Sequence, residues 1–177
     1  DAMRTNGINR TKIFSNISWY EGVGESTGQN ENSFELVTFG SSFNVCDRQK
    51  ALNETARILK PNGWFVCMWN HRELNDPIQS KIEEVIKSHI EGYGYGTRRQ
   101  DQKEVINSSN LFGPVVHIDS VITHIQKIED CKEAWASHAT LQRQAGEKFK
   151  LIIQEIEELL NSFKTNEIKI PYSTNIW

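Results

Sequence analysis

Two short polar stretches follow apolar runs in this sequence, and both carry side chains that could bind a ligand or move a proton. The first is "GSSFN", residues 40–44, which interrupts the run "FELVTF". Gly40 has no Cβ and lets a ligand approach the backbone, while the hydroxyls of Ser41 and Ser42 can form hydrogen bonds. Phe43 can pack on the apolar part of a ligand. The alternative is an ordinary strand-to-helix loop with a capping role.

The second stretch is "WNHR", at the end of the apolar run "WFVCMW". Four side chains are expected to reach the same edge as the first stretch and to contact a substrate: Trp69, Asn70, His71 and Arg72. An Arg or His there can bind an acidic substrate, and His71 is the candidate general base. A surface loop is the alternative for each residue taken singly.

Two apolar strands and one helix must position these stretches. The runs at 34–39 and 64–69 are predicted strands, and the second is so continuously apolar that we expect it to be covered on both faces. Asp47 is a predicted N-cap, and apolar residues recur at helical spacing as far as Leu59, after which "KPNG" stops the helix. This order predicts a parallel α/β sheet, which binds ligands beyond the carboxyl ends of its strands.

An aromatic loop follows the second polar stretch. Asp76 is a predicted N-cap for a helix over 77–89, and "GYGYG", residues 92–96, comes next. We expect a mobile loop there, with Tyr93 and Tyr95 as candidate substrate contacts.

Further elements are predicted on either side. "NISWYE", residues 16–21, has the aromatic and β-branched content of a short strand, and the polar residues 22–33 form a loop. Three later elements are a strand or bent hairpin over 114–126, a long helix over 145–163, and a final strand over 168–177.

Composition and charge limit the function classes. The 177 residues are 37% hydrophobic and 24% charged, which fits one domain with a real core. The net charge of -3 gives no electrostatic reason to expect nucleic acid or a membrane as partner. Cys46, Cys67 and Cys131 are widely spaced and form no zinc motif, so we expect no metal and a reduced, cytoplasmic protein. Cys67 is predicted to be a small buried hydrophobe.

The sequence "SFELVTFGSSFNVCDRQKALNETARILKPNGWFVCMWNHRELNDP", residues 33–77, resembles the core between the fourth and fifth strands of class I S-adenosylmethionine-dependent methyltransferases. The similarity is greatest to the type 11 small-molecule group, which includes ubiquinone/menaquinone C-methyltransferase-like and trans-aconitate-like enzymes. The ending "IPYSTNIW" resembles the closing antiparallel strand of that fold. The resemblance implies a Rossmann-like methyltransferase sheet, mostly parallel with an antiparallel C-terminal strand. It also implies methyl transfer to a small-molecule acceptor.

The resemblance implies a cofactor and its contacts. S-adenosyl-L-methionine would place its methionine part along residues 40–43. In the loop "GVGES", Gly24 and Glu25 would border the adenine, mainly through their backbone, although a solvated turn is an equal alternative. Asn44 stands where related enzymes often have His, so it can orient a group but cannot act as a base.

The Gly-rich turn and the ribose-binding acid that family members place before this region are not found in the sequence. The resemblance therefore implies that the N-terminal strands are missing and that residues 1–177 form a single, partial methyltransferase domain. An uncovered sheet edge invites pairing with another chain. We therefore expect a homodimer or a complementing N-terminal segment, and weak or no cofactor binding by the chain alone.

Two other functions stay open. The chain could be a non-catalytic methyltransferase-like remnant that acts as an interaction subunit, which a test of cofactor binding would separate from an enzyme. A nucleotide-binding oxidoreductase of similar fold is disfavoured, because "ILKPNG" is a turn of the methyltransferase type.

Overall fold

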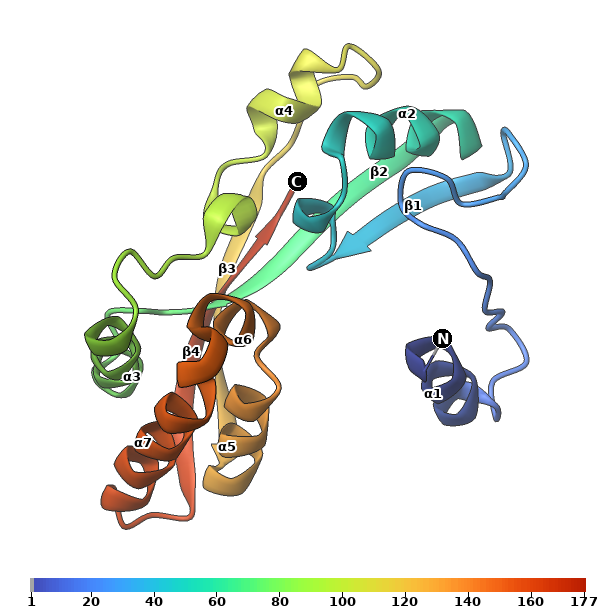
Figure 1. Ribbon diagram of the computed structural model, residues 1–177. Helices are drawn as coiled ribbons and strands as arrows, with labels where there is room; N and C mark the ends of the chain where they lie inside the picture. The colour runs from blue at the N-terminus through green and yellow to red at the C-terminus, as the bar shows by residue number, and fades with distance from the viewer. Residues whose placement is uncertain (1) are drawn as a thin grey trace. The chain divides into compact units, whose positions relative to one another are not determined.

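The computed structural model describes residues 2–177, which divide into two compact units (Figure 1). Unit 1 contains the described residues up to Cys67 together with Gln102–Val116 and Trp177. Unit 2 contains Met68–Asp101 and His117–Ile176.

Four strands form one open sheet in the order β1-β2-β4-β3. They are β1 (Phe34–Gly40), β2 (Leu59–Arg72), β3 (Ile118–Lys127) and β4 (Glu167–Ile176). β1 and β2 run in the same direction and are joined by helix α2 (Arg48–Ile58), as Figure 1 shows. β4 is antiparallel to both β2 and β3. The predicted α/β class and the antiparallel C-terminal strand are therefore confirmed, but the described sheet is partly and not mostly parallel.

Helix α2 in unit 1 begins where the sequence predicted. The Asp47 side chain accepts a hydrogen bond from the Lys50 backbone N–H at 3.2 Å and caps the helix. The helix ends at Ile58, and β2 begins at the very next residue. "KPNG" therefore lies inside β2, with Asn62 in the left-handed region at φ 65°. The predicted end of the helix is therefore correct.

The predicted strand over 16–21 is wrong. Helix α1 (Ala2–Thr11) precedes this segment, and the Trp19 indole N–H donates to the Thr11 hydroxyl at 2.8 Å. The Trp19 ring lies so close to Gly7 that a Cβ there would come within 2.3 Å of it. The aromatic content that favours extension is used here to pack on a helix, and no neighbouring strand pairs with the segment within the described residues.

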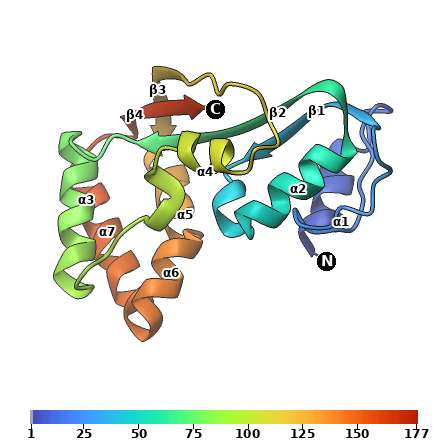
Figure 2. The ribbon, with the colours of Figure 1, turned by 90° about the horizontal axis from the view of Figure 1, so that it is seen from above.

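Unit 2 contains four helices that lie on one side of the β3–β4 pair, as Figures 1 and 2 show. They are α3 (Pro77–His89), α5 (Ile128–Ala136), α6 (Ala139–Ala145) and α7 (Phe149–Ser162). Asp76 caps α3 as predicted, accepting from the backbone N–H groups of Ile78 and Gln79. The long helix predicted over 145–163 is confirmed as α7, but it begins only at Phe149, because Gly146 at φ 54° ends α6 just before it.

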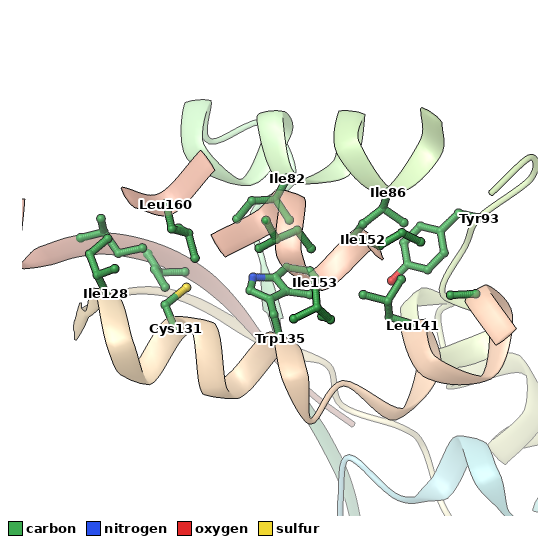
Figure 3. Packing of buried hydrophobic residues seen from close by; sticks show 14 residues of the cluster. Ile82, Ile86, Tyr93, Ile128, Cys131, Trp135, Leu141, Ile152, Ile153 and Leu160 are labelled. Carbon is green, nitrogen blue, oxygen red and sulfur yellow. The ribbon is translucent and has the colours of Figure 1, made fainter. Parts of the chain in front are cut away.

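The core of unit 2 forms where these helices meet (Figure 3). Ile82 and Ile86 of α3, Trp135 of α5 and Ile152 of α7 are all buried in it. Each such side chain stabilises the fold by about 1.5–3 kcal/mol through removal from water. Tyr93 is also buried here, so residues 92–96 are anchored to the core, in contrast to the mobile loop that we predicted.

Coverage of β2 is uneven. Cys67 is buried as predicted, but Trp64 is 68% exposed, so the expectation of a strand covered on both faces is wrong at its beginning. The remaining short elements are η1 (Phe43–Val45), η2 (Gly96–Arg99), α4 (Lys103–Ser108) and η3 (Gly146–Lys148). No helix within residues 2–177 has the length and apolarity needed to cross a membrane.

Candidate functional site

The first candidate surface lies in unit 1, at the carboxyl end of β1. β1 ends at Gly40, and no atom lies within 4 Å of the place where a Cβ on this residue would stand. The next residue, Ser41, is exposed and has φ 54°, a backbone conformation that side chains other than Gly, Asn and Asp seldom adopt. Strained residues of this kind cluster at ligand sites. Gly40 and Ser41 thus present backbone and a hydroxyl to open space.

Phe43 belongs to the core of unit 1 and not to this open surface. Its side chain is fully buried, and its ring meets the rings of Phe39 and Phe65 edge-on at 5.5 and 5.4 Å. The prediction that Phe43 contacts a ligand is therefore wrong. Its side chain instead supports the loop from the core. Ser42 and Asn44 are half-buried beside it, at the start of η1 and within it.

The loop with Gly24 and Glu25 packs against the start of α2. One oxygen of Glu25 accepts a hydrogen bond from the Asp47 backbone N–H at 2.6 Å. A Cβ on Gly24 would come within 2.7 Å of the Cys46 sulfur, so the absence of a side chain serves internal packing. These contacts place both residues beside the predicted cofactor loop, but they occupy the Glu25 carboxylate within the chain.

The second candidate surface is a pocket in unit 2 with a cavity of about 200 Å³. The last residues of β2 supply Asn70, His71 and Arg72, so three of the four residues predicted to contact a substrate meet here. Tyr95 of the aromatic loop, which was also predicted to contact a substrate, lines the same pocket. The rest of the lining comes from more distant parts of unit 2: Arg98, Arg99, His138 and Tyr172.

Trp69 and Tyr93 do not line this pocket. Trp69 is 1% exposed, and its burial corrects the expectation that all of residues 69–72 reach the ligand edge. Tyr93 packs edge-on against Tyr95 at 5.5 Å and supports it from the core. The side chain of Asn70 accepts a hydrogen bond from the Thr174 hydroxyl at 2.7 Å, which fixes its orientation.

The arginines of the pocket are held by aromatic rings. The Arg72 guanidinium lies over the Trp135 ring at 4.7 Å and near the Tyr172 ring at 5.9 Å. Arg99 lies over Tyr95 at 4.6 Å, and it donates to the Arg72 carbonyl at 2.8 Å. These contacts fix the positions of the guanidinium groups without neutralising their charge.

Both histidines of the pocket are kept neutral. Burial, followed by the charges of Arg99 and Arg98, lowers the pKa of His71 to about 4. Burial, followed by Arg72 and Arg98, lowers the pKa of His138 to about 4. His138 Nδ1 accepts from the Leu141 backbone N–H at 3.1 Å and caps α6. His71 is 6% exposed and forms a hydrogen bond with the Arg98 backbone, but its Nε2 has no partner.

The tautomer of His71 follows from these contacts. Because Nε2 has no partner, we assign the bond with the Arg98 backbone to Nδ1. That bond acts against the lowering of the His71 pKa, as expected when a ring N–H donates to a carbonyl. The neutral ring then keeps the lone pair of Nε2 free to accept a proton or a hydrogen bond.

Sequence reasoning missed Arg98, Arg99, His138 and Tyr172. The paired arginines directly after "GYGYG" were a usable signal, because η2 turns them back to the end of β2. His138 gave no signal of its own, since its place depends on the break between α5 and α6.

A larger cavity of about 930 Å³ lies elsewhere in unit 2, where α5 begins and α7 ends. Its lining includes Lys127 and Lys164 together with Glu129 and Glu167, all exposed. Among the described residues, none of its lining side chains has a buried polar atom without a partner. Charges of both signs on an open surface give no specific chemistry, and the pocket at the end of β2 is the stronger candidate.

Comparison with known proteins finds a family match over the first third of the chain. Residues 2–67 match the methyltransferase domain family. The chain is 34% identical over 85 residues to demethylmenaquinone methyltransferase of Staphylococcus haemolyticus, covering 48% of this chain and 34% of that protein. It is 34% identical over 75 residues to the mitochondrial 2-methoxy-6-polyprenyl-1,4-benzoquinol methylase of Xenopus laevis, covering 42% of this chain and 24% of that one. The chain thus spans about a quarter to a third of these curated relatives.

A likeness in fold extends over most of the chain. A solved structure from Anaeromyxobacter dehalogenans, thought to be a type II methyltransferase, has a TM-score of 0.58 and 10% sequence identity to this chain. The match covers 92% of this chain and 71% of that one. The predicted resemblance to class I methyltransferases and the Rossmann-like α/β fold are therefore confirmed.

Proposed function

We propose that this chain is part of a methyltransferase that uses S-adenosyl-L-methionine to methylate a small molecule. The observation that carries the proposal is the match of residues 2–67 to the methyltransferase domain. That segment contains β1 and the open loop after it, and ligands of α/β sheets bind beyond the carboxyl ends of the strands. When bound, S-adenosylmethionine supplies an electrophilic methyl group on a positively charged sulfur.

The residues of unit 1 fit a bound cofactor at Gly40 and Ser41. The space beside Gly40 is open, and a branched side chain there would fill it. The hydroxyl of the exposed Ser41 is available to hydrogen-bond a ligand. Gly24 and Glu25 would contribute through their backbone, because the Glu25 carboxylate already accepts from Asp47. Phe43 holds the loop from below through its contacts with Phe39 and Phe65.

The residues of unit 2 fit the methyl acceptor. His71 is neutral near pH 7, and its Nε2 is buried without a partner. With the acceptor in the pocket, this nitrogen would take the proton that a hydroxyl acceptor loses as its oxygen gains the methyl group. The fixed Asn70 side chain and Tyr95 would orient the acceptor. Positioning of this kind supplies most of the rate in a direct group transfer, and the base adds a smaller part.

The test is methyl transfer by the full-length protein. We would incubate it with S-adenosylmethionine labelled in the methyl group and with a low-molecular-weight cell extract. We expect the label in small molecules, and less of it with the variant His71→Ala. Cofactor binding without any transfer would favour the alternative of a non-catalytic interaction subunit, and the absence of both would overturn the proposal.

We further propose a cytoplasmic protein that pairs through the free edge of β1, with a second copy or a complementing N-terminal segment. All three cysteines are free thiols, as expected in a reducing compartment. Leu36 of β1 is exposed, and β1 has only β2 as neighbour among the described strands. Such edges invite strand addition. Light scattering should show a dimer or larger species, and a stable monomer would contradict this pairing.

A further inference from the structure

Three guanidinium groups surround the pocket at the end of β2, and no carboxylate lines it. Within residues 2–177, neither Arg72, Arg98 nor Arg99 forms an ion pair with an acidic side chain. Arg72 and Arg98 are half-buried, and the Nε of each is buried without a hydrogen-bond partner. Burying an unpaired charge is costly, so the chain alone leaves this pocket electrostatically unsatisfied.

An acidic group that contacts the pocket lining, Glu83, is already used. The buried Glu83 carboxylate accepts a hydrogen bond from the Tyr95 hydroxyl and pairs with Lys87 at 3.6 Å. Glu83 is therefore bound to the Tyr95 hydroxyl and paired with a lysine that does not line the pocket. Burial and the neighbouring charges of Arg99 and Arg72 lower the pKa of Arg98, while Tyr95 and Tyr93 oppose this lowering. Glu83 therefore does not neutralise the positive charge of the arginines that line the pocket.

We infer that this pocket binds a carboxylate group of the methyl acceptor, so that the substrate is a small carboxylic acid. That the bound acid is the methyl acceptor rests on the proposed function. The planar guanidinium groups offer paired N–H donors that match the two oxygens of a carboxylate. A carboxylate beside these guanidinium groups would compensate the positive charge that the chain alone leaves unpaired.

Size and surroundings favour a carboxylate over a phosphate. The cavity of about 200 Å³ is below the usual range of about 300–1,000 Å³ for larger ligands, so it suits a small group. The rings of Tyr95 and Tyr172 form part of the lining. A carboxylate carries one charge, whereas a phosphate monoester near pH 7 carries about two, which makes removal from water beside these rings more costly.

The bound acid would also strengthen the proposed base. Arg99 and Arg98 are the charged groups that lower the His71 pKa, and Arg72, His138, Tyr95 and Tyr172 line the same pocket. An anion among these groups weakens the repulsion between the arginines and a protonated His71. Its pKa should then rise from about 4 toward its ordinary value. His71 would become an effective base only when the acid is present.

The first experiment measures anion binding by the full-length protein without cofactor. We would titrate succinate by calorimetry at constant ionic strength, with succinamide as the uncharged analogue and inorganic phosphate as the competing anion. We expect saturable binding of succinate, weaker binding of phosphate, and none of succinamide. Tighter binding of phosphate would overturn the carboxylate assignment, and equal binding of succinamide would overturn the whole inference.

Two arginine variants assign the binding to this pocket. Arg98→Gln should weaken succinate binding roughly tenfold to a hundredfold, because bonds to charged groups are lost. Arg98→Lys keeps the charge, and its affinity for succinate should lie between those of the wild type and Arg98→Gln. The matched control is Arg143→Gln, since Arg143 is exposed on α6 and does not line the pocket. Equal affinity in Arg98→Gln, Arg98→Lys and the wild type would overturn the inference.

A second measurement follows His71 itself by NMR. With succinate present, its imidazole should titrate at a higher pH than without it, and this shift should shrink in Arg98→Gln. An unshifted His71 would contradict the coupling. Neither measurement uses the cofactor. A failure of methyl transfer with intact succinate binding would therefore contradict only the proposed function. Loss of succinate binding with intact transfer would remove only this inference.

Discussion

Mild acid should destabilise this protein through His71 and His138. Burial and nearby arginines lower the pKa of each from 6.5 to about 4 in the folded state. Between these values the unfolded chain binds protons that the folded chain does not. The stabilisation is therefore fully present above pH 6.5 and is lost as the pH falls toward 4.

The size of the effect follows from the two pKa values. At about pH 5, a histidine with an unfolded pKa of 6.5 and a folded pKa near 4 loses about 2 kcal/mol relative to neutral pH. The two together lose about 4 kcal/mol, which is large against a total stability of about 5–15 kcal/mol. Acidic residues contribute mainly at lower pH, as the Glu54 pKa of about 2 illustrates.

The assay is urea unfolding of the wild type and of the double variant His71→Asn/His138→Asn at about pH 7.5 and about pH 5. Asn at 138 can still cap α6 in place of the ring nitrogen that accepts from Leu141. The double variant should lose far less stability between the two pH values. His124→Asn is the control, since His124 is exposed on β3. Equal pH dependence in the wild type and the double variant would refute the reasoning.

Three further predictions concern packing, a hydrogen-bonded carboxylate and the thiols. Ile152→Ala should lower the unfolding free energy by about 2–5 kcal/mol, whereas Leu151→Ala, at a position 48% exposed, should cost far less, as thermal unfolding can show. Glu54→Gln should cost about 1–3 kcal/mol in urea unfolding, because Glu54 accepts from Thr27 and Arg57, and exposed Glu84→Gln should not. Iodoacetamide labelling read by mass spectrometry should modify Cys46 first and leave buried Cys67, whose pKa is raised to about 12, and Cys131 for the unfolded chain.

Local signals predicted much of the fold. Asp47 and Asp76 were recognisable as N-caps because the capping bond joins neighbours in sequence, and both helices begin there. The strand over 34–39 was found through its apolar pattern, and the antiparallel C-terminal strand through the resemblance to methyltransferases. The strand over 16–21 failed because strand propensity needs a paired neighbour, and Trp19 packs on α1 instead.

The candidate site could be predicted only in part. Asn70, His71 and Arg72 were found because they follow an apolar strand in sequence, and Tyr95 because it lies in an unusual aromatic loop. Arg98, Arg99 and His138 reach the same pocket through the folding of η2 and α6, which no local pattern encodes. The burial of Phe43 and Trp69 depends on tertiary contacts, so their residue type alone suggested ligand contacts that the fold does not provide.

The most direct test of the central claim is calorimetric titration of the full-length protein with S-adenosylhomocysteine. We predict binding in the micromolar range and a loss of at least tenfold, about 1.4 kcal/mol, in Gly40→Val, whose side chain would fill the open space beside β1. Gly113→Val is the matched control, because Gly113 is also exposed with no atom near a Cβ and lies outside the proposed site. No binding by the wild type, or equal affinity in Gly40→Val, would contradict the account.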